Sequence, residues 1–383
     1  MNLCPEDGRP IQAVYDTDAI KASQWYDPER PNMWRFAGLL PLAEGFVSLG
    51  EGHTALLDYH DHPLAQSKGF SLFIKDEGKG HPGFSQNPTL SFKDRGMAVV
   101  ANMAKHFGLT QLVVPTQGNA GDSLACYANQ LGLGATIIMP DDTPMPIQGS
   151  VAALAFKNPD INLDMVSGTI KEAGALMKAK YLPQGFFNVA TFQEPGWRIE
   201  GKKTMGLELA EPNLMSQQWQ LPDVILYPTG GGTGILGMWK AFDELQALGM
   251  IGVHRPRVVA VQSAATPPVA EAIAQERFEP EPTEAGQTLA VGLNVAGGVG
   301  HFKVVEIVRQ SGGTAITINE ADIAASLSAV WQDKGWWICP EGAACLAALE
   351  PLLQQGHIHP GEQVVVFNTG SFEKYLPEVR HLL

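Results

Sequence analysis

The feature that most constrains the fold of this chain is an alternation of short apolar runs with helical patterns. Each run has the length of a strand and is rich in Val, Ile and Leu, and helical stretches such as residues 94–107 lie between the runs. The runs cover residues 72–74, 112–114, 135–139, 224–227, 258–261 and 364–367. Strands that alternate with helices form parallel sheets covered by helices, and these sheets bind ligands at the carboxyl ends of their strands. The pattern therefore predicts an α/β protein.

Length and charge narrow the class of protein further. The 383 residues predict two domains or three, and 45% apolar with 17% charged residues is typical of a well-buried globular enzyme. The formal net charge of −14, with no basic run longer than Lys202-Lys203, repels nucleic acid and anionic membranes, so we expect neither as a partner. No apolar stretch approaches the roughly 20 residues of a membrane span. The start, from Met1 to Asp7, lacks the basic and apolar regions of a signal peptide.

The cysteines indicate a reducing compartment. Cys4, Cys126, Cys339 and Cys345 form no C-x-x-C pair, which disfavours both a disulfide framework and a zinc site. We therefore expect a cytoplasmic protein with mostly buried thiols and no bound metal.

Two segments fall outside the alternation. Residues 277–285 are rich in Pro and Glu and predict an exposed loop. The first 45 or so residues carry scattered aromatic side chains without clear periodicity, namely Trp25, Tyr26, Trp34 and Phe36. We expect this arm to wrap over a neighbouring surface.

A glycine-rich segment, Tyr227-Pro228-Thr229-Gly230-Gly231-Gly232-Thr233-Gly234-Ile235-Leu236-Gly237, follows a predicted strand and opens a predicted helix. Successive glycines let backbone N–H groups converge on an anion, and the start of a helix adds the positive end of its dipole. The segment lacks the lysine of a nucleotide P-loop. Its spacing fits a dinucleotide fingerprint, but the next strand ends in Val261-Gln262-Ser263, without an acidic residue to hold a ribose. A tight turn without a ligand is the third interpretation, and a phosphate monoester is the favoured occupant.

A second signal is the segment Asn87-Pro88-Thr89-Leu90-Ser91-Phe92-Lys93-Asp94-Arg95-Gly96. A lysine forms an imine with an aldehyde only after its amine loses a proton, which burial among apolar or cationic neighbours favours. Phe92 would supply an apolar wall, and Ser91 or Asp94 could cap the following helix. Taken alone, Lys93 is better explained as a solvated lysine at a helix start, next to an acidic residue.

Together the two segments resemble a known family. Ser91-Phe92-Lys93-Asp94-Arg95-Gly96 is similar to the lysine motif of threonine synthases, within the pyridoxal-phosphate family that includes the tryptophan synthase β chain. Further segments match in the order of the family: Leu49-Gly50-Glu51-Gly52-His53-Thr54, Gln117-Gly118-Asn119-Ala120-Gly121, Glu194-Pro195-Gly196-Trp197-Arg198-Ile199-Glu200-Gly201-Lys202-Lys203-Thr204, Cys339-Pro340-Glu341-Gly342-Ala343-Ala344 and Asn368-Thr369-Gly370-Ser371. The resemblance covers most of the chain.

The resemblance implies a fold and a domain division. The fold would consist of two parallel-sheet α/β domains, as in the tryptophan synthase β chain, with the cofactor in the cleft between them. Residues 1–48 would form an N-terminal arm, and residues 49–98 with 197–383 the large cofactor-binding domain. Residues 99–196 would form the small domain.

The resemblance also implies site residues for pyridoxal 5'-phosphate. Lys93 would be the catalytic residue and carry the cofactor as an imine, Asn119 would hydrogen-bond the ring hydroxyl, and Thr369 would face the pyridine nitrogen. A hydroxyl there leaves that nitrogen mostly unprotonated, which suits elimination and replacement chemistry. For Asn119 a helix cap, and for Thr369 a turn at a strand end, are the structural alternatives. The phosphate would be held by Gly230, Gly231, Gly232, Thr233 and Gly234, and the substrate by Thr116, Gln117, Gly118 and Arg198.

Several departures bear on the substrate. Cys4-Pro5-Glu6-Asp7-Gly8 resembles half of the zinc ribbon that begins some threonine synthases, with one cysteine lost. Residues 79–86 look like an insertion before the lysine motif. Gln117 replaces a small hydroxyl residue that usually contacts the substrate carboxylate, and Phe372-Glu373 replaces small residues.

The resemblance favours threonine synthase activity, in which O-phosphohomoserine and water give threonine and phosphate. Arg198, Lys202 and Arg95 are candidate cations for the substrate phosphate, and each could equally be a surface or salt-bridge residue. The enzyme would act as a homodimer on a phosphorylated amino acid. The alternatives are a β-eliminating lyase (a threonine or serine dehydratase or a diaminopropionate ammonia-lyase) and a cysteate synthase-like β-replacement enzyme. An NAD-dependent dehydrogenase and a catalytically silent homologue are alternatives from other classes.

Overall fold

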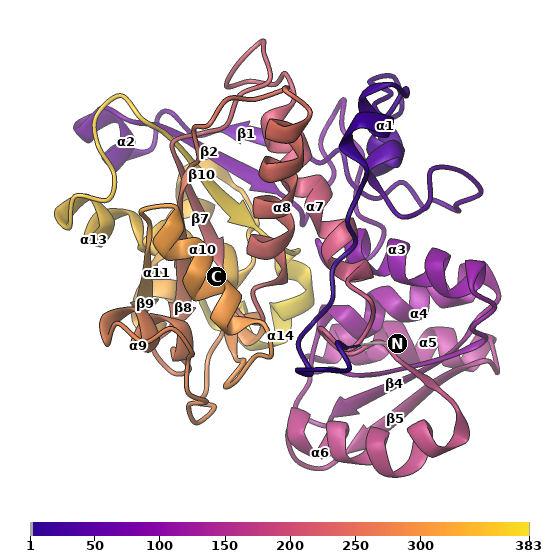
Figure 1. Ribbon diagram of the computed structural model, residues 1–383. Helices are drawn as coiled ribbons and strands as arrows, with labels where there is room; N and C mark the ends of the chain where they lie inside the picture. Colours follow the sequence, from indigo (N-terminus) through magenta and orange to yellow (C-terminus); the bar gives the residue numbers. More distant parts are fainter. Residues whose placement is uncertain (1–2, 383) are drawn as a thin grey trace.

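The computed structural model describes residues 3–382. Met1, Asn2 and Leu383 lie outside the described residues, and the first two of them belong to the start that was predicted not to be a signal peptide. Two sheets organise the chain (Figure 1). The larger has six strands in the order β1 (Leu56–Asp58), β2 (Ser71–Asp76), β10 (Gln363–Asn368), β7 (Val224–Pro228), β8 (Arg257–Ser263) and β9 (Thr314–Ile318). The smaller has four, in the order β5 (Ile161–Val166), β4 (Gly134–Pro140), β3 (Gln111–Pro115) and β6 (Phe187–Asn188).

All neighbouring strands are parallel except the pair β1 and β2. Every apolar run that predicted a strand lies in one, and the helix predicted at residues 94–107 is α3 (Lys93–His106). The α/β class with two parallel-sheet units is therefore confirmed.

Helices cover both faces of the larger sheet, because its central strands are apolar on both sides. In β7, Ile225 and Tyr227 pack against one set of helices, while Val224 and Leu226 pack against the other. The first set is α7 (Trp197–Ala210), α8 (Thr233–Ala247), α9 (Pro268–Ala274) and α10 (His301–Gln310). The second is α2 (Pro63–Lys68), α11 (Glu320–Lys334), α12 (Pro340–Ala347), α13 (Leu349–Gln354) and α14 (Leu376–Val379).

The smaller sheet packs with α3, α4 (Asn119–Leu131), α5 (Met145–Lys157) and α6 (Ile170–Leu176). Helix α3 also packs along α7, so it joins the two halves of the molecule. It runs through the predicted domain boundary at residues 98 and 99, and the domain division itself remains a prediction.

The N-terminal arm, which includes α1 (Thr17–Lys21), lies against both halves and is drawn in indigo in Figure 1. Trp25 and Tyr26 pack against Trp219, with ring centroids 5.7 and 5.2 Å apart. Phe36 is buried in the core beside α7 and α8, and Trp34 is buried in the core of α3 and α4. The predicted wrapping of this arm is confirmed.

The remaining sequence expectations are met unevenly. Residues 277–285 contain no helix or strand and are mostly exposed, as predicted. All the cysteines are free thiols, of which Cys339 and Cys345 are buried and the other two partly exposed. Within residues 3–382 no helix is long and apolar enough to span a membrane, and no group of three metal-ligating side chains gathers.

Candidate active site

A cavity of about 450 Å³ lies where loops from both sheets meet. Its walls come from the start of α3, the turn between β3 and α4, the turn between β7 and α8, and the residue after β10. These turns follow the carboxyl ends of parallel strands, where α/β proteins bind ligands. The cavity is lined by all the residues predicted for the site: Lys93, Thr116, Gln117, Gly118, Asn119, Arg198, Gly230, Gly231, Gly232, Thr233, Gly234 and Thr369. Their individual roles remain predictions.

Lys93 is the first residue of α3. Its backbone N–H donates to Ser91 Oγ at 3.3 Å, but the cap residue of α3 is Phe92, without a side-chain cap bond, so the predicted capping by Ser91 is wrong. Asp94 does not cap the helix either, because its carboxylate accepts from Thr89 and Ser123 instead. The Lys93 ammonium lies 4.6 Å from the centre of the Phe92 ring.

Burial, with a further contribution from the nearby Arg198 guanidinium, lowers the pKa of Lys93 from 10.5 to about 8, against the opposing effect of Glu341. A sizeable fraction of this amine is therefore neutral near pH 7.5. A neutral amine is what attack on an aldehyde requires.

The glycine-rich turn connects β7 to α8 and is packed too closely for side chains at Gly230, Gly232 and Gly234. A Cβ on Gly230 would lie 2.3 Å from the Gly292 carbonyl oxygen, and one on Gly232 would lie 2.2 Å from Val304 Cγ2. Gly232 has φ +77°, a conformation that favours glycine. His301 Nε2 donates to the Gly230 carbonyl oxygen at 2.8 Å and supports the turn from behind. The turn thus presents backbone groups and the start of a long helix to the cavity, which fits a phosphate.

Asn119 is the first residue of α4, whose cap is Gly118 with no side-chain bond, so the helix-cap interpretation of Asn119 is wrong. Its Nδ2 donates to the Tyr375 hydroxyl at 3.2 Å, and within the described chain its buried Oδ1 has no partner. Thr369 follows β10, with its hydroxyl 3.8 Å from Cys339 Sγ. A buried polar atom without a partner is rare in proteins, so Asn119 fits a polar ligand at this wall.

Arg198, near the start of α7, lines the cavity but makes no ion pair within the described residues. Its guanidinium donates to Thr191 Oγ1 at 3.1 Å and to the Val189 carbonyl oxygen, and its Nε has no partner. Burial lowers the pKa of Arg198 from its ordinary value to about 10, with Glu194 opposing. Among the described residues that line the cavity, Arg198 and Lys93 are the only lysines or arginines.

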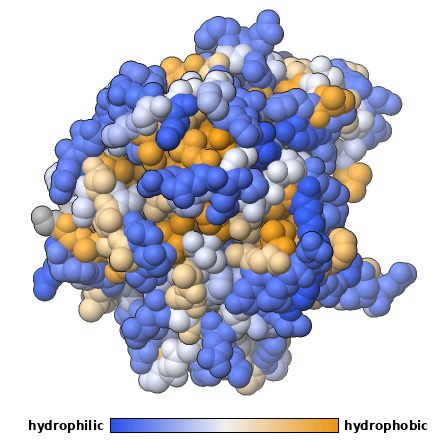
Figure 2. All heavy atoms as spheres, turned by 90° about the vertical axis from the view of Figure 1, so that its left-hand side faces the viewer, coloured by the Kyte–Doolittle hydropathy of each residue, from blue (hydrophilic) through white to orange (hydrophobic). Residues whose placement is uncertain are grey.

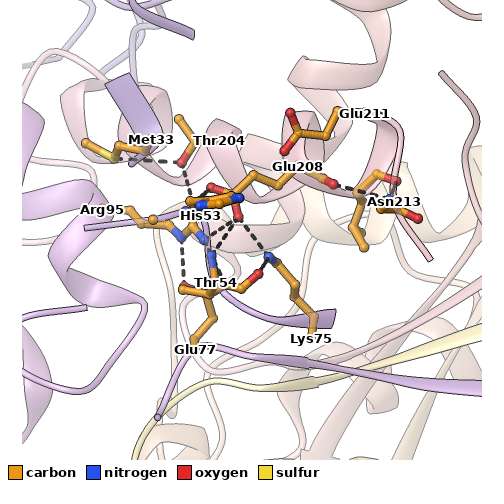
Figure 3. A network of polar contacts seen from close by, with 12 residues as sticks. Met33, His53, Thr54, Lys75, Glu77, Arg95, Thr204, Glu208, Glu211 and Asn213 are labelled. Carbon is orange, nitrogen blue, oxygen red and sulfur yellow. Dashed lines mark hydrogen bonds and ion pairs between the residues drawn. The ribbon is translucent and has the colours of Figure 1, made fainter. Parts of the chain in front are cut away.

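Arg95 is not a substrate ligand, although the sequence made it a candidate. It lies outside the cavity in a buried network with Glu77, Glu208 and Thr54 (Figure 3), and its Nε and Nη1 are 2.7 Å from the Glu77 and Glu208 carboxylates. Lys202 also lies outside the cavity lining and donates to the Thr233 hydroxyl.

Several lining residues were not predicted from the sequence. Glu341 accepts a hydrogen bond from the Gly292 N–H at 2.8 Å, and burial raises its pKa. Tyr375, Thr191 and residues 291–299 complete the walls. Glu341 belongs to the segment Cys339-Pro340-Glu341-Gly342, so its place among the matched motifs was the available signal.

Comparisons with known proteins agree with this geometry. Residues 47–370 match the family model described as pyridoxal-phosphate dependent enzyme. The threonine synthase of Methanosarcina acetivorans is 28% identical over 366 residues, covering 95% of this chain and 85% of that protein. The threonine synthase of Methanocaldococcus jannaschii is 28% identical over 378 residues, covering 95% and 87%.

Solved structures share the fold. Diaminopropionate ammonia lyase from Escherichia coli superimposes with a TM-score of 0.70 at 18% identity, covering 88% of each chain. An L-serine ammonia-lyase from Rhizomucor miehei has a TM-score of 0.69 at 18% identity, covering 86% of this chain and 97% of that one. The matched family model spans both sheets and every predicted site residue. Pyridoxal phosphate, the cofactor of that family, fits a cavity in which a glycine-rich turn can bind a phosphate and a partly neutral lysine can react with an aldehyde. This chain therefore belongs to the pyridoxal-phosphate-dependent enzyme family.

Proposed function

We propose that this enzyme is a threonine synthase, which converts O-phosphohomoserine and water to threonine and phosphate. The observation that carries the proposal is Arg198, a buried cavity-lining guanidinium that forms no ion pair among the described residues. Glu194 offsets the cost of burying this charge only in part, and an anionic ligand would offset the rest. A second phosphate, carried by the substrate, would do so through charge-assisted hydrogen bonds.

The relatives support the same choice, because the two archaeal proteins matched along nearly all of the chain are threonine synthases. The cavity is also large enough for an amino-acid substrate beside a cofactor, since its volume of about 450 Å³ falls within the usual range for small-molecule sites.

In this proposal each residue has a distinct task. When bound, the cofactor ring stabilises negative charge on the substrate carbons. Lys93 takes and returns protons at the substrate Cα and Cβ, for which a pKa of about 8 is well suited. Thr116, Gln117 and Gly118 hold the substrate carboxylate on the turn before α4. Asn119 and Thr369 orient the ring, and Gly230, Gly231, Gly232, Thr233 and Gly234 hold its phosphate.

The test compares two substrates in wild type and Arg198→Ala. Wild type should release phosphate from O-phosphohomoserine. The variant should lose about 10- to 150-fold in kcat/KM on this substrate, since a charged hydrogen bond contributes about 1.5–3 kcal/mol. Any slow release of ketoacid from threonine, which carries no phosphate, should barely change. Equal loss on both substrates would remove Arg198 as the phosphate ligand, and no phosphate release by wild type would refute the proposed reaction.

The second candidate is a β-eliminating lyase acting on threonine, serine or diaminopropionate. It is favoured by the apolar part of the cavity wall, where Ile147, Ile170 and Phe192 would suit a short substrate. Ketoacid release from one of these amino acids, faster than phosphate release from O-phosphohomoserine, would decide for it.

A homodimer remains part of the proposal. Figure 2 shows apolar side chains gathered in the middle of the face that lies to the left in Figure 1, divided by a band of hydrophilic ones. Such patches mark association surfaces in many proteins. Sedimentation of the purified protein at two concentrations checks this expectation.

A further inference from the structure

Lys202 is a second buried lysine next to the site, and it lies behind the glycine-rich turn rather than in the cavity wall. Its side chain is 1% exposed, and its amine donates to the hydroxyl of Thr233, the first residue of α8. The same amine lies 4.8 Å from the centre of the Phe92 ring, and the Lys93 amine lies 4.6 Å from it. Two lysine amines therefore flank one aromatic ring at the base of the turn.

The surroundings of Lys202 contain too little negative charge for a buried ammonium. Within residues 3–382 it makes no ion pair, and its one hydrogen-bond partner is a neutral hydroxyl. Burial, together with Lys93 and Arg198, holds the pKa of Lys202 well below its ordinary value, and Glu194 opposes this only in part. The positive end of the α8 dipole further disfavours a positive charge on the Lys202 amine. Neighbouring Lys203, in contrast, pairs with Glu200 and Glu244 at 2.7 and 2.9 Å.

A phosphate in the turn would supply the missing charge. The Thr233 hydroxyl that receives the Lys202 hydrogen bond belongs to the turn that lines the cavity, so an anion there lies next to the amine. Arg198 lines the cavity itself, and the proposed function assigns it to a substrate group.

We propose that Lys202 is a binding residue for the cofactor phosphate: its ammonium supplies positive charge behind the glycine-rich turn and orients the Thr233 hydroxyl toward the phosphate. This inference rests on the phosphate site proposed for Gly230 to Gly234, and it is independent of which amino acid the enzyme converts. A turn made only of backbone amides and a hydroxyl would bind a phosphate through neutral donors. A charged donor roughly doubles the strength of such a hydrogen bond.

The test compares pyridoxal 5'-phosphate with pyridoxal, which has the same aldehyde and no phosphate. Equilibrium affinities for apoenzyme are measured by quenching of tryptophan fluorescence in wild type, Lys202→Met, Lys202→Gln and Lys157→Met. Met keeps the size of lysine without a hydrogen bond, and Gln keeps a donor for Thr233 without the charge. Lys157 is exposed in the last turn of α5, so its variant controls for net charge alone.

We expect both Lys202 variants to lose affinity for pyridoxal 5'-phosphate by about 10- to 150-fold, as for a charged hydrogen bond, and to keep their affinity for pyridoxal. Unchanged affinity for the phosphate form in both variants would overturn the proposal. So would equal losses on the two ligands, because the lysine would then support the fold alone. If Lys202→Gln bound pyridoxal 5'-phosphate as tightly as wild type while Lys202→Met bound it weakly, the charge would not matter. Lys202 would then only hold the Thr233 hydroxyl by a neutral hydrogen bond, which would also overturn the proposal.

The outcome in wild type separates this inference from the proposed site. If wild type bound pyridoxal as tightly as pyridoxal 5'-phosphate, the phosphate site itself would be wrong, whatever Lys202 does. Failure to release phosphate from O-phosphohomoserine would refute the proposed reaction and leave the Lys202 result standing.

Discussion

At the scale of single residues, the charge on Lys93 is set by its burial and by two groups that come from distant parts of the sequence. Burial disfavours its ammonium most, Arg198 disfavours it further, and Glu341 favours it. The balance leaves the pKa of Lys93 at about 8, so small changes in either neighbour alter the fraction of reactive amine near neutral pH.

This balance predicts how attachment of the cofactor depends on pH. The rate at which pyridoxal 5'-phosphate attaches to apoenzyme should rise with pH, with its midpoint near 8, because only the deprotonated amine reacts. Arg198→Ala should move the midpoint upward by removing a cation, and Glu341→Gln should move it downward by removing an anion. Stopped-flow absorbance of the attached cofactor measures the rate. Lys93→Ala is the control and should neither attach the cofactor nor retain it after borohydride reduction, and a midpoint near 10.5 would contradict the assigned burial.

A matched pair of substitutions tests the phosphate site at Gly231. A Cβ at this position would meet only Thr191 Cγ2, at 3.5 Å, so a side chain fits here without the clash found at Gly232. Gly231→Asp would place a carboxylate beside the cofactor phosphate, and like charges at that distance repel. We expect affinity for pyridoxal 5'-phosphate to fall at least about 10-fold further in Gly231→Asp than in Gly231→Asn, which has the same shape without the charge. Titration of apoenzyme measures this, and equal affinities would place the phosphate elsewhere.

At the scale of helices and strands, the start of α3 is fixed by the buried network shown in Figure 3. Arg95 lies two residues after Lys93 and pairs with Glu77 beyond β2 and with Glu208 of α7. The two helices also approach closely, since a Cβ on Gly201 would lie 2.0 Å from the Arg95 carbonyl oxygen. The network and this close packing therefore fix the position of Lys93 relative to the part of the cavity wall that α7 supplies.

Removal of one charge from this network should destabilise the protein strongly. Glu208 receives hydrogen bonds from Arg95 and Lys75 at 2.7 to 2.8 Å, and although burial alone would raise its pKa, these cations hold it below its ordinary value. Glu208→Gln should lower the free energy of unfolding by about 3–5 kcal/mol, because it leaves buried positive charge without a partner. Urea denaturation measures this change. Glu29→Gln, at an exposed position, is the control and should change it by less than about 0.5 kcal/mol.

The strands show which elements the sequence could predict. Every strand that was missed, namely β1, β5, β6 and β9, lies at an edge of its sheet. Edge strands are not buried on both faces, so they lack the continuous apolar run by which the central strands were recognised. Strand β9 (Thr314–Ile318) includes two threonines and is largely half-buried, and β6 has only two residues. The candidate site was predicted more completely, because its turns directly follow central strands or carry the matched motifs.

At the scale of the whole molecule, the site depends on contacts that no local pattern contains. Glu341 acts on the charge of Lys93 because α12 and α3, far apart in sequence, both contribute to the wall of the cavity. Arg95 was wrongly considered as a cation for the substrate, because its carboxylate partners lie far away in the sequence, at positions 77 and 208. Alternation of strands and helices predicts the fold class, whereas partners across the cavity follow from the assembled structure.

The charge of the whole molecule leads to a last prediction, which concerns substrate entry. The net charge of −14 repels an anionic substrate from outside the cavity, while Arg198 attracts it only at close range. Raising KCl from about 0.01 to 0.15 M shortens the Debye length from about 30 to 8 Å, which screens the distant charges and leaves the buried guanidinium largely unscreened. The kcat/KM for O-phosphohomoserine should therefore rise by roughly 2- to 5-fold over this range, as measured by phosphate release. Serine, a zwitterion without net charge, is the control and should show little change. The same rise should persist in Arg198→Ala, because it originates in the distant charges, and a fall in wild type would mean that the local cation dominates entry.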